Sequence, residues 1–107
     1  MNEKRIELLK SYIAEEPQNP FNTYALAMEY FEHAPEHAAE LLLSLSEQHP
    51  DYLPTYYKAA NLCWELGQLS KARTLFEKGI ELAKSQKDEK ALGELNTAFL
   101  NFQFEEE

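Results

Sequence analysis

The feature that most constrains this chain is an apolar helical pattern that occurs twice. Four residues follow the steps of three and four that place side chains on one face of an α-helix: Tyr24, Ala27, Met28 and Phe31. The pattern returns 32 residues later at Tyr56, Ala59, Ala60 and Cys63. The helices that follow match at a spacing of 34 residues, where Ala38, Leu42, Leu45 and Pro50 correspond to Ala72, Phe76, Gly79 and Lys84. Two helix pairs of one design therefore lie in tandem.

Prolines and glycines divide the chain into about six helical segments. Asn19 before Pro20 is the arrangement of an N-cap followed by proline at the first helical position. Asp51 is expected to cap the fourth helix, and Gly67 to end it in the left-handed conformation. No segment alternates apolar and polar residues as a strand does. Because the connections are short, the helices must pack as antiparallel neighbours, and the sequence predicts an all-α fold.

These helix pairs resemble the tetratricopeptide repeat (TPR). In the second pair the resemblance is carried by large and small residues at the positions of the repeat pattern: Tyr56, Ala59, Ala60, Cys63, Gly67, Ala72, Phe76 and Gly79. The first pair matches at Tyr24, Ala27, Met28, Phe31, Ala38, Leu42, Leu45 and Pro50, with a shorter turn that lacks the glycine. Cys63 stands where the pattern has an aromatic residue and Lys84 where it has proline, so the fifth helix is expected to run on by a turn.

The resemblance implies a right-handed α-α superhelix of about six antiparallel helices. We expect one helical-repeat domain over residues 1–107, with an N-terminal helix in 1–17, a first TPR-like unit in 20–50, a second TPR unit in 53–86 and a C-terminal capping helix in 88–104. A single unit cannot bury its apolar face, so the flanking helices are expected to cap the two units. Small residues such as Ala72 and Gly79 suit positions where helix backbones approach closely.

The charge of the chain bounds the kind of partner. Its 10 Lys and Arg against 19 Asp and Glu give a formal net charge of −9. This field repels phosphate backbones and anionic lipids, so neither nucleic acid nor a membrane is an expected partner, whereas a basic peptide or protein is favoured. No apolar run approaches the roughly 20 residues of a bilayer span. The single cysteine, Cys63, favours a reducing compartment, and a cytoplasmic protein is expected.

No residue pattern predicts catalysis or a cofactor. The sequence has no glycine-rich phosphate loop, nucleophile elbow or histidine–carboxylate arrangement. His33 and His37 are four residues apart, but Pro35 lies between them and no third ligand converges, so no metal site is expected. Cys63 lies on an apolar stripe without the cationic neighbour that a reactive thiolate needs, which favours a structural role. We therefore expect neither an enzyme nor a bound cofactor.

The resemblance implies a concave binding groove lined by the first helix of each pair. Carried over to this sequence, the groove positions are Asn22, Ala25, Glu29 and Glu32, then Pro54, Tyr57, Asn61 and Trp64, with Thr97 and Leu100 joining from the last helix. Helix geometry supports one set independently, because Tyr57, Asn61 and Trp64 step by four and three. Two aromatic rings around an amide suit a peptide-binding surface, since Asn can form two hydrogen bonds to a peptide backbone. The alternative is that Tyr57 and Trp64 pack against the first helix pair.

Some members of the family hold a C-terminal carboxylate with lysine, asparagine and arginine side chains. Here Lys58 and Asn61 are the candidates for that role, while Glu29 and Glu32 face the same groove. The acidic neighbours oppose a carboxylate ligand, so a complete clamp is not expected.

We predict a non-enzymatic scaffold that binds a peptide or a partner protein in the groove. The alternative is a dedicated chaperone or assembly subunit for one partner.

In the last helix, Phe99 and Phe102 are expected to face the fifth helix, whereas Leu100 and Phe104 lie off that stripe. A monomer or weak homo-oligomer is expected, with the charges of Glu105 to Glu107 limiting self-association. The alternative for Phe104 is that it folds back over the end of the bundle.

Overall fold

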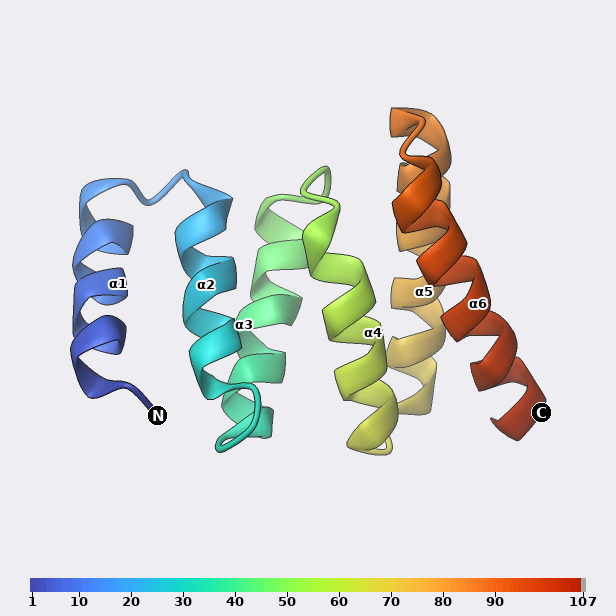
Figure 1. The fold of residues 1–107 in the computed structure, drawn as a ribbon, viewed down its shortest axis with the longest axis horizontal. Coiled ribbons are helices and arrows are strands. Elements are labelled where there is room, and N and C mark those ends of the chain that lie inside the picture. The colour runs from blue at the N-terminus through green and yellow to red at the C-terminus, as the bar shows by residue number, and fades with distance from the viewer. Residues whose placement is uncertain (107) are drawn as a thin grey trace. The chain divides into compact units, whose positions relative to one another are not determined.

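A computed structural model describes residues 1–106 (Figure 1). These residues form no β-strand and six α-helices: α1 (Glu3–Glu15), α2 (Pro20–Tyr30), α3 (Pro35–Gln48), α4 (Pro54–Glu65), α5 (Leu69–Gln86) and α6 (Glu89–Glu106). The predicted all-α fold is confirmed. The chain divides into two compact units, unit 1 over Met1–Tyr52 and unit 2 from Leu53 onward. Glu107, whose charge we expected to limit self-association, lies outside the described residues.

Caps and prolines set where the helices begin. At the start of α2, the Asn19 Oδ1 accepts a hydrogen bond from the Phe21 N–H at 3.1 Å, as predicted for a cap before a proline. Asp88 Oδ1 accepts one at 3.0 Å from the first turn of α6. The prediction of Asp51 as the N-cap residue of α4 is wrong, because Leu53 holds that position and its side chain forms no cap hydrogen bond. Proline at the first position of α4 removes one of the N–H groups that a cap would satisfy.

Left-handed residues end α4 and α5. Gly67 follows α4 with a φ of 77°, and the next N–H, that of Gln68, reaches back to the Cys63 carbonyl oxygen at 2.8 Å. This is the glycine stop that the sequence predicts. α5 continues past Lys84, as the lack of proline there predicts, and ends at Gln86, followed by Lys87 with a φ of 57°.

In unit 1, α2 packs between α1 and α3. The core is built from buried aliphatic side chains of the three helices, among them Ile6, Leu9, Leu26, Ala27, Ala38 and Leu42. Polar contacts at the edge join the same helices. Arg5 Nε lies 2.8 Å from Glu29 Oε2 across α1 and α2, and the His37 ring stacks on Tyr30 at a centroid distance of 4.2 Å across α3 and α2.

In unit 2, α4 and α5 approach closely at a glycine. A Cβ atom built on Gly79 would lie 2.7 Å from the Tyr56 Cβ and 3.1 Å from a methyl carbon of Leu95. Real Cβ atoms are essentially never that close to another carbon, so only glycine fits without movement. Ala72 lies on the same face of α5 as Gly79 and is completely buried. These small residues let α5 lie against its neighbours, as the repeat pattern predicts.

An aromatic cluster joins α5 and α6. The Phe76 ring lies 5.5 Å from Phe99 and 5.6 Å from Phe102, measured between ring centroids. The Arg73 guanidinium covers Phe99 and Phe102 at 5.7 and 5.6 Å. The prediction that these two phenylalanines face α5 is confirmed. Phe104 is 87% exposed, so the alternative that it folds back over the end of the bundle is wrong.

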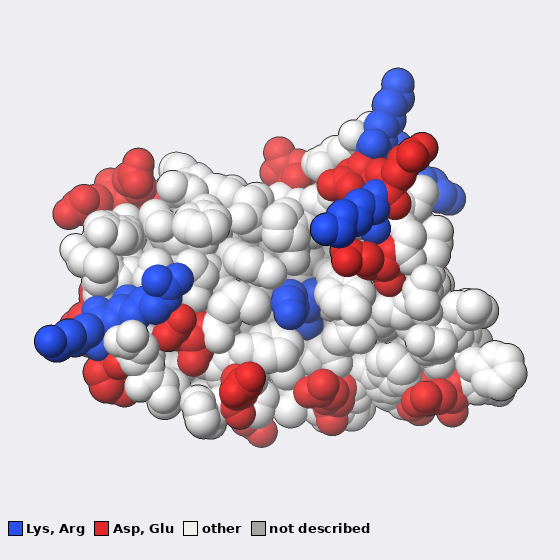
Figure 2. All heavy atoms as spheres, viewed as in Figure 1, with Lys and Arg blue, Asp and Glu red and all other residues white. Residues whose placement is uncertain are grey.

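Acidic side chains are visible on both units in the space-filling view (Figure 2), in keeping with the net charge of −9. Among the residues that the structure describes, no helix combines the length and apolarity needed to cross a bilayer.

Candidate functional site: a groove between α4 and α6

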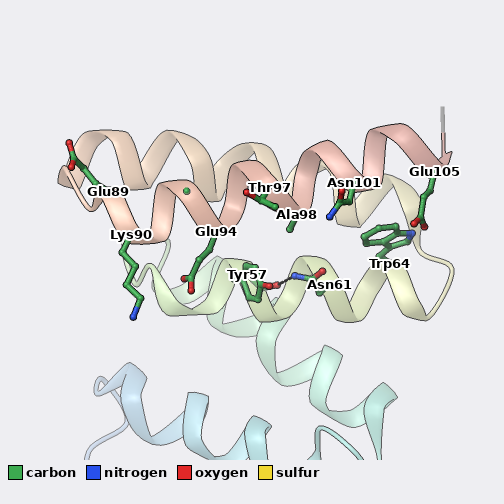
Figure 3. A pocket seen from close by; sticks show the side chains of 11 residues that line it. Tyr57, Asn61, Trp64, Glu89, Lys90, Glu94, Thr97, Ala98, Asn101 and Glu105 are labelled. Carbon is green, nitrogen blue, oxygen red and sulfur yellow. Dashed lines mark hydrogen bonds between the residues drawn. The ribbon is translucent and has the colours of Figure 1, made fainter.

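Unit 2 contains an open groove between α4 and α6 with a volume of about 670 Å³ (Figure 3). Tyr57, Asn61 and Trp64 line it from α4, and Thr97 lines it from α6. The structure thus brings four of the residues expected at the groove together around one hollow. Its volume falls within the range of pockets that hold small ligands and side chains. Leu100 is 61% exposed and lies outside this set of lining residues.

The three α4 residues share one face because they are four and three positions apart on a helix. The Asn61 Nδ2 donates a hydrogen bond to the Tyr57 carbonyl oxygen at 2.8 Å, which uses one of the two N–H groups of the carboxamide. Tyr57 itself is 39% exposed. The amide is therefore held in place by its own helix, beside a tyrosine ring that is open to solvent.

Trp64 is fixed by two contacts with α6. Its indole N–H donates to Glu106 Oε2 at 3.0 Å, and its ring meets Phe102 edge to face at a centroid distance of 5.3 Å. The side chain remains half-buried, so part of the ring is open to the groove. The indole therefore contacts the aromatic cluster of unit 2 through Phe102 and also lines the groove.

The α6 wall adds charged residues that the sequence analysis does not predict for the groove. Glu89, Glu94 and Glu105 line it together with a single basic residue, Lys90. Asn101 adds an amide between them. Residues 90, 94, 97, 101 and 105 step by three or four, so they form one face of α6 (Figure 3). Extending the face of Thr97 along the helix reaches these four residues, but the sequence alone does not indicate that this face turns toward α4.

The remaining predicted residues lie elsewhere. Asn22 is only 6% exposed, which leaves a partner little access to its side chain. The Glu29 carboxylate makes the ion pair with Arg5 inside unit 1. Glu32 is exposed, just after α2. Lys58 is half-buried on α4 and is not among the residues that line the groove.

The groups considered for metal binding or nucleophilic chemistry have other surroundings. Within residues 1–106, no three His, Cys, Asp or Glu side chains gather as a metal site would require. His37 stacks on Tyr30. Cys63 is a free thiol with no exposed surface, and burial raises its pKa while the charge of Lys71 opposes the rise. A raised pKa keeps the sulfur in its protonated, weakly reactive form at neutral pH.

Comparisons with known proteins agree with this architecture. The family model for the tetratricopeptide repeat matches residues 53–86. A crystal structure of a tetratricopeptide repeat domain protein from Salinibacter ruber is 36% identical, with a TM-score of 0.75, and the match covers 79% of this chain and 96% of that one. A solution NMR structure of such a domain from the same organism is also 36% identical, with a TM-score of 0.74 and coverage of 81% and 89%.

A third structure, of a Bordetella parapertussis protein, is 23% identical with a TM-score of 0.77. The match covers 94% of this chain and 88% of that one, and at this identity it supports the fold alone. A search of curated protein sequences gives no match. The 36% identity over nearly the whole Salinibacter ruber domain, the matched family model and the paired helices lead to one conclusion. This chain belongs to the tetratricopeptide repeat family.

Proposed function

We propose that the protein is a non-enzymatic interaction scaffold that binds a peptide or a segment of a partner protein in the groove between α4 and α6. Tetratricopeptide repeat proteins generally act as scaffolds that bind protein partners. The observation that carries the proposal is the meeting of Tyr57, Asn61 and Trp64 on one wall of a groove of about 670 Å³. Aromatic side chains contribute much of the affinity of peptide interfaces, and an amide can hydrogen-bond the peptide backbone. The free thiol of Cys63 suits a reducing compartment such as the cytoplasm.

The direct test is selection of peptides from a random displayed library on the immobilised protein. Selected peptides are expected to change the emission of Trp64, the single tryptophan of the chain. Replacing Tyr57 and Asn61 together by alanine should weaken the binding of the selected peptides by about tenfold or more, because we expect both side chains to contact the ligand. Tyr12→Ala is the matched control, since Tyr12 on α1 is 41% exposed, close to the 39% of Tyr57. Peptides that bind the double variant as tightly as the parent would refute the groove.

One observation favours the alternative of a dedicated chaperone or assembly subunit. Leu100 and Phe104 stand one helical turn apart on α6, 61% and 87% exposed. Such an open apolar pair suits contact with one particular partner helix. Purification from native lysate distinguishes the two functions. A chaperone would carry one partner in fixed stoichiometry, and Leu100→Ser with Phe104→Ser would release it. A peptide-binding scaffold would instead release its partners when Tyr57 and Asn61 are replaced by alanine.

A further inference from the structure

The groove between α4 and α6 carries an unbalanced charge. Three carboxylates, those of Glu89, Glu94 and Glu105, line it against the one ammonium group of Lys90. Glu106 stands at the Trp64 end as the acceptor of the indole hydrogen bond. All four charged residues are exposed, so this excess of negative charge acts through solvent and is screened by salt. A ligand with positive side chains therefore complements the groove better than a neutral or acidic one.

The carboxylates are not gathered at one point. In Figure 3, Glu94 lies on the side of the groove near Tyr57, and Glu105 lies beside Trp64. Each of these carboxylates thus has an aromatic ring across from it or next to it. A lysine or arginine side chain can place its charge against the face of an aromatic ring while it pairs with a carboxylate. The groove places a carboxylate near an aromatic residue at two positions (Figure 3).

The distance between the Glu94 and Glu105 positions determines how far apart the two basic side chains of a peptide must be. Glu94 and Glu105 are eleven positions apart on α6, which corresponds to about 16 Å along the helix axis at 1.5 Å per residue. An extended peptide advances about 3.3 Å per residue, so roughly five residues span that distance. Basic side chains are long, and successive side chains of an extended peptide point to opposite faces. The separation between the two basic residues can therefore be about four to six residues.

We propose that the groove binds an extended basic segment in which two lysine or arginine side chains stand about four to six residues apart, one at Glu94 and Tyr57 and one at Glu105 and Trp64. This inference rests on the proposed function of the groove and adds the chemistry of its ligand. Asn61 and Asn101 lie between the two charge positions and offer hydrogen bonds to the intervening peptide backbone.

The test uses fluorescein-labelled synthetic peptides of alanine, serine and leucine that hold two lysines at separations from about two to nine residues, with a two-glutamine peptide as the neutral reference. Binding is measured by fluorescence anisotropy on the full chain and by Trp64 emission. We expect an affinity maximum at separations of about four to six, at least tenfold tighter than the reference. Replacing Glu94 and Glu105 together by glutamine should remove most of that advantage. Raising the salt concentration should weaken binding of the basic peptides more than that of the reference.

The matched control is the double variant Glu77→Gln, Glu81→Gln. Both residues are exposed on α5 and lie outside the groove, and their substitution removes the same charge as the groove variant. A control variant that loses as much affinity as the groove variant would mean attraction to net charge alone, and would overturn the inference. An affinity that does not change with the separation of the two lysines would also overturn the inference. Neutral peptides that bind as tightly as basic ones, and that Tyr57→Ala weakens, would refute the basic ligand while the groove itself stands. If no peptide of either kind binds and the displayed library yields none, both proposals fail.

Discussion

The glycine at the crossing of α4 and α5 offers the sharpest test of the packing in unit 2. In Gly79→Ala, the new methyl group would stand 2.7 Å from the Tyr56 Cβ. That carbon is bonded directly to the α4 backbone, so rotation of the tyrosine side chain cannot move it away. The Leu95 methyl carbons at 3.1 and 3.2 Å can turn aside more easily. The helices themselves must therefore separate by some tenths of an ångström.

Two effects of opposite sign decide the stability of this variant. Alanine in a helix interior is favoured over glycine by about 1 kcal/mol, while overpacking of a close crossing costs about 1–3 kcal/mol. Gly79→Ala should therefore lower the free energy of unfolding by about 0–2 kcal/mol. Gly93→Ala isolates the first effect, because Gly93 lies within α6 and a Cβ built there meets no atom within 4 Å. That control should gain close to 1 kcal/mol.

The measurement is equilibrium unfolding in urea, followed by the emission of Trp64, which lies in the same unit as both glycines. The two variants should differ by about 1–3 kcal/mol, which places their urea midpoints roughly 0.5 to 1.5 M apart. Equal stabilisation of Gly79→Ala and Gly93→Ala would refute the reasoning, because the α4–α5 crossing would then have room for a methyl group.

Two further predictions concern a helix cap and the buried thiol. Asn19→Ala removes the 3.1 Å hydrogen bond to the Phe21 N–H and should cost about 1 kcal/mol in thermal or urea unfolding of unit 1; an unchanged midpoint would mean that the cap contributes nothing. Burial raises the pKa of Cys63 above its ordinary 9.0, so the unfolded chain loses the thiol proton first, and stability should fall as the pH rises above 9.0. A Cys63→Ala variant should show a shallower decline over that range, and a thiol reagent should modify the native wild-type protein only at the rate at which it unfolds.

Much of the fold was predictable because local rules determine it. The steps of three and four among Tyr56, Ala59 and Ala60 require a helix, and Gly67 ends that helix through its own backbone freedom. The N-cap of α4 was predicted wrongly, since Asp51 and Leu53 compete for a role that depends on a few backbone angles. The division into two units falls between Tyr52 and Leu53, and the repeat pattern, which treats the two helix pairs alike, does not indicate it.

The candidate site was predictable on one wall only. Tyr57, Asn61 and Trp64 share a face of one helix, so their spacing alone groups them. The opposite wall requires knowledge of which face of α6 turns toward α4. The hydrogen bond between Trp64 and Glu106 joins residues 42 positions apart, and nothing in the spacing of either residue indicates the other. For the same reason Glu94 and Glu105 entered the groove only with the structure.

The order of packing along the chain has a consequence for synthesis on the ribosome. Most helix contacts within each unit join neighbours in sequence, α1 with α2, α2 with α3, α4 with α5 and α5 with α6. Chains of such low contact order fold in milliseconds or less, whereas translation at about 5 to 20 residues per second needs roughly 3 to 11 s for unit 2. Unit 1 can therefore form while unit 2 is still being made. The groove needs α6 for its second wall, so a nascent chain acquires it only after the last of the six helices has emerged.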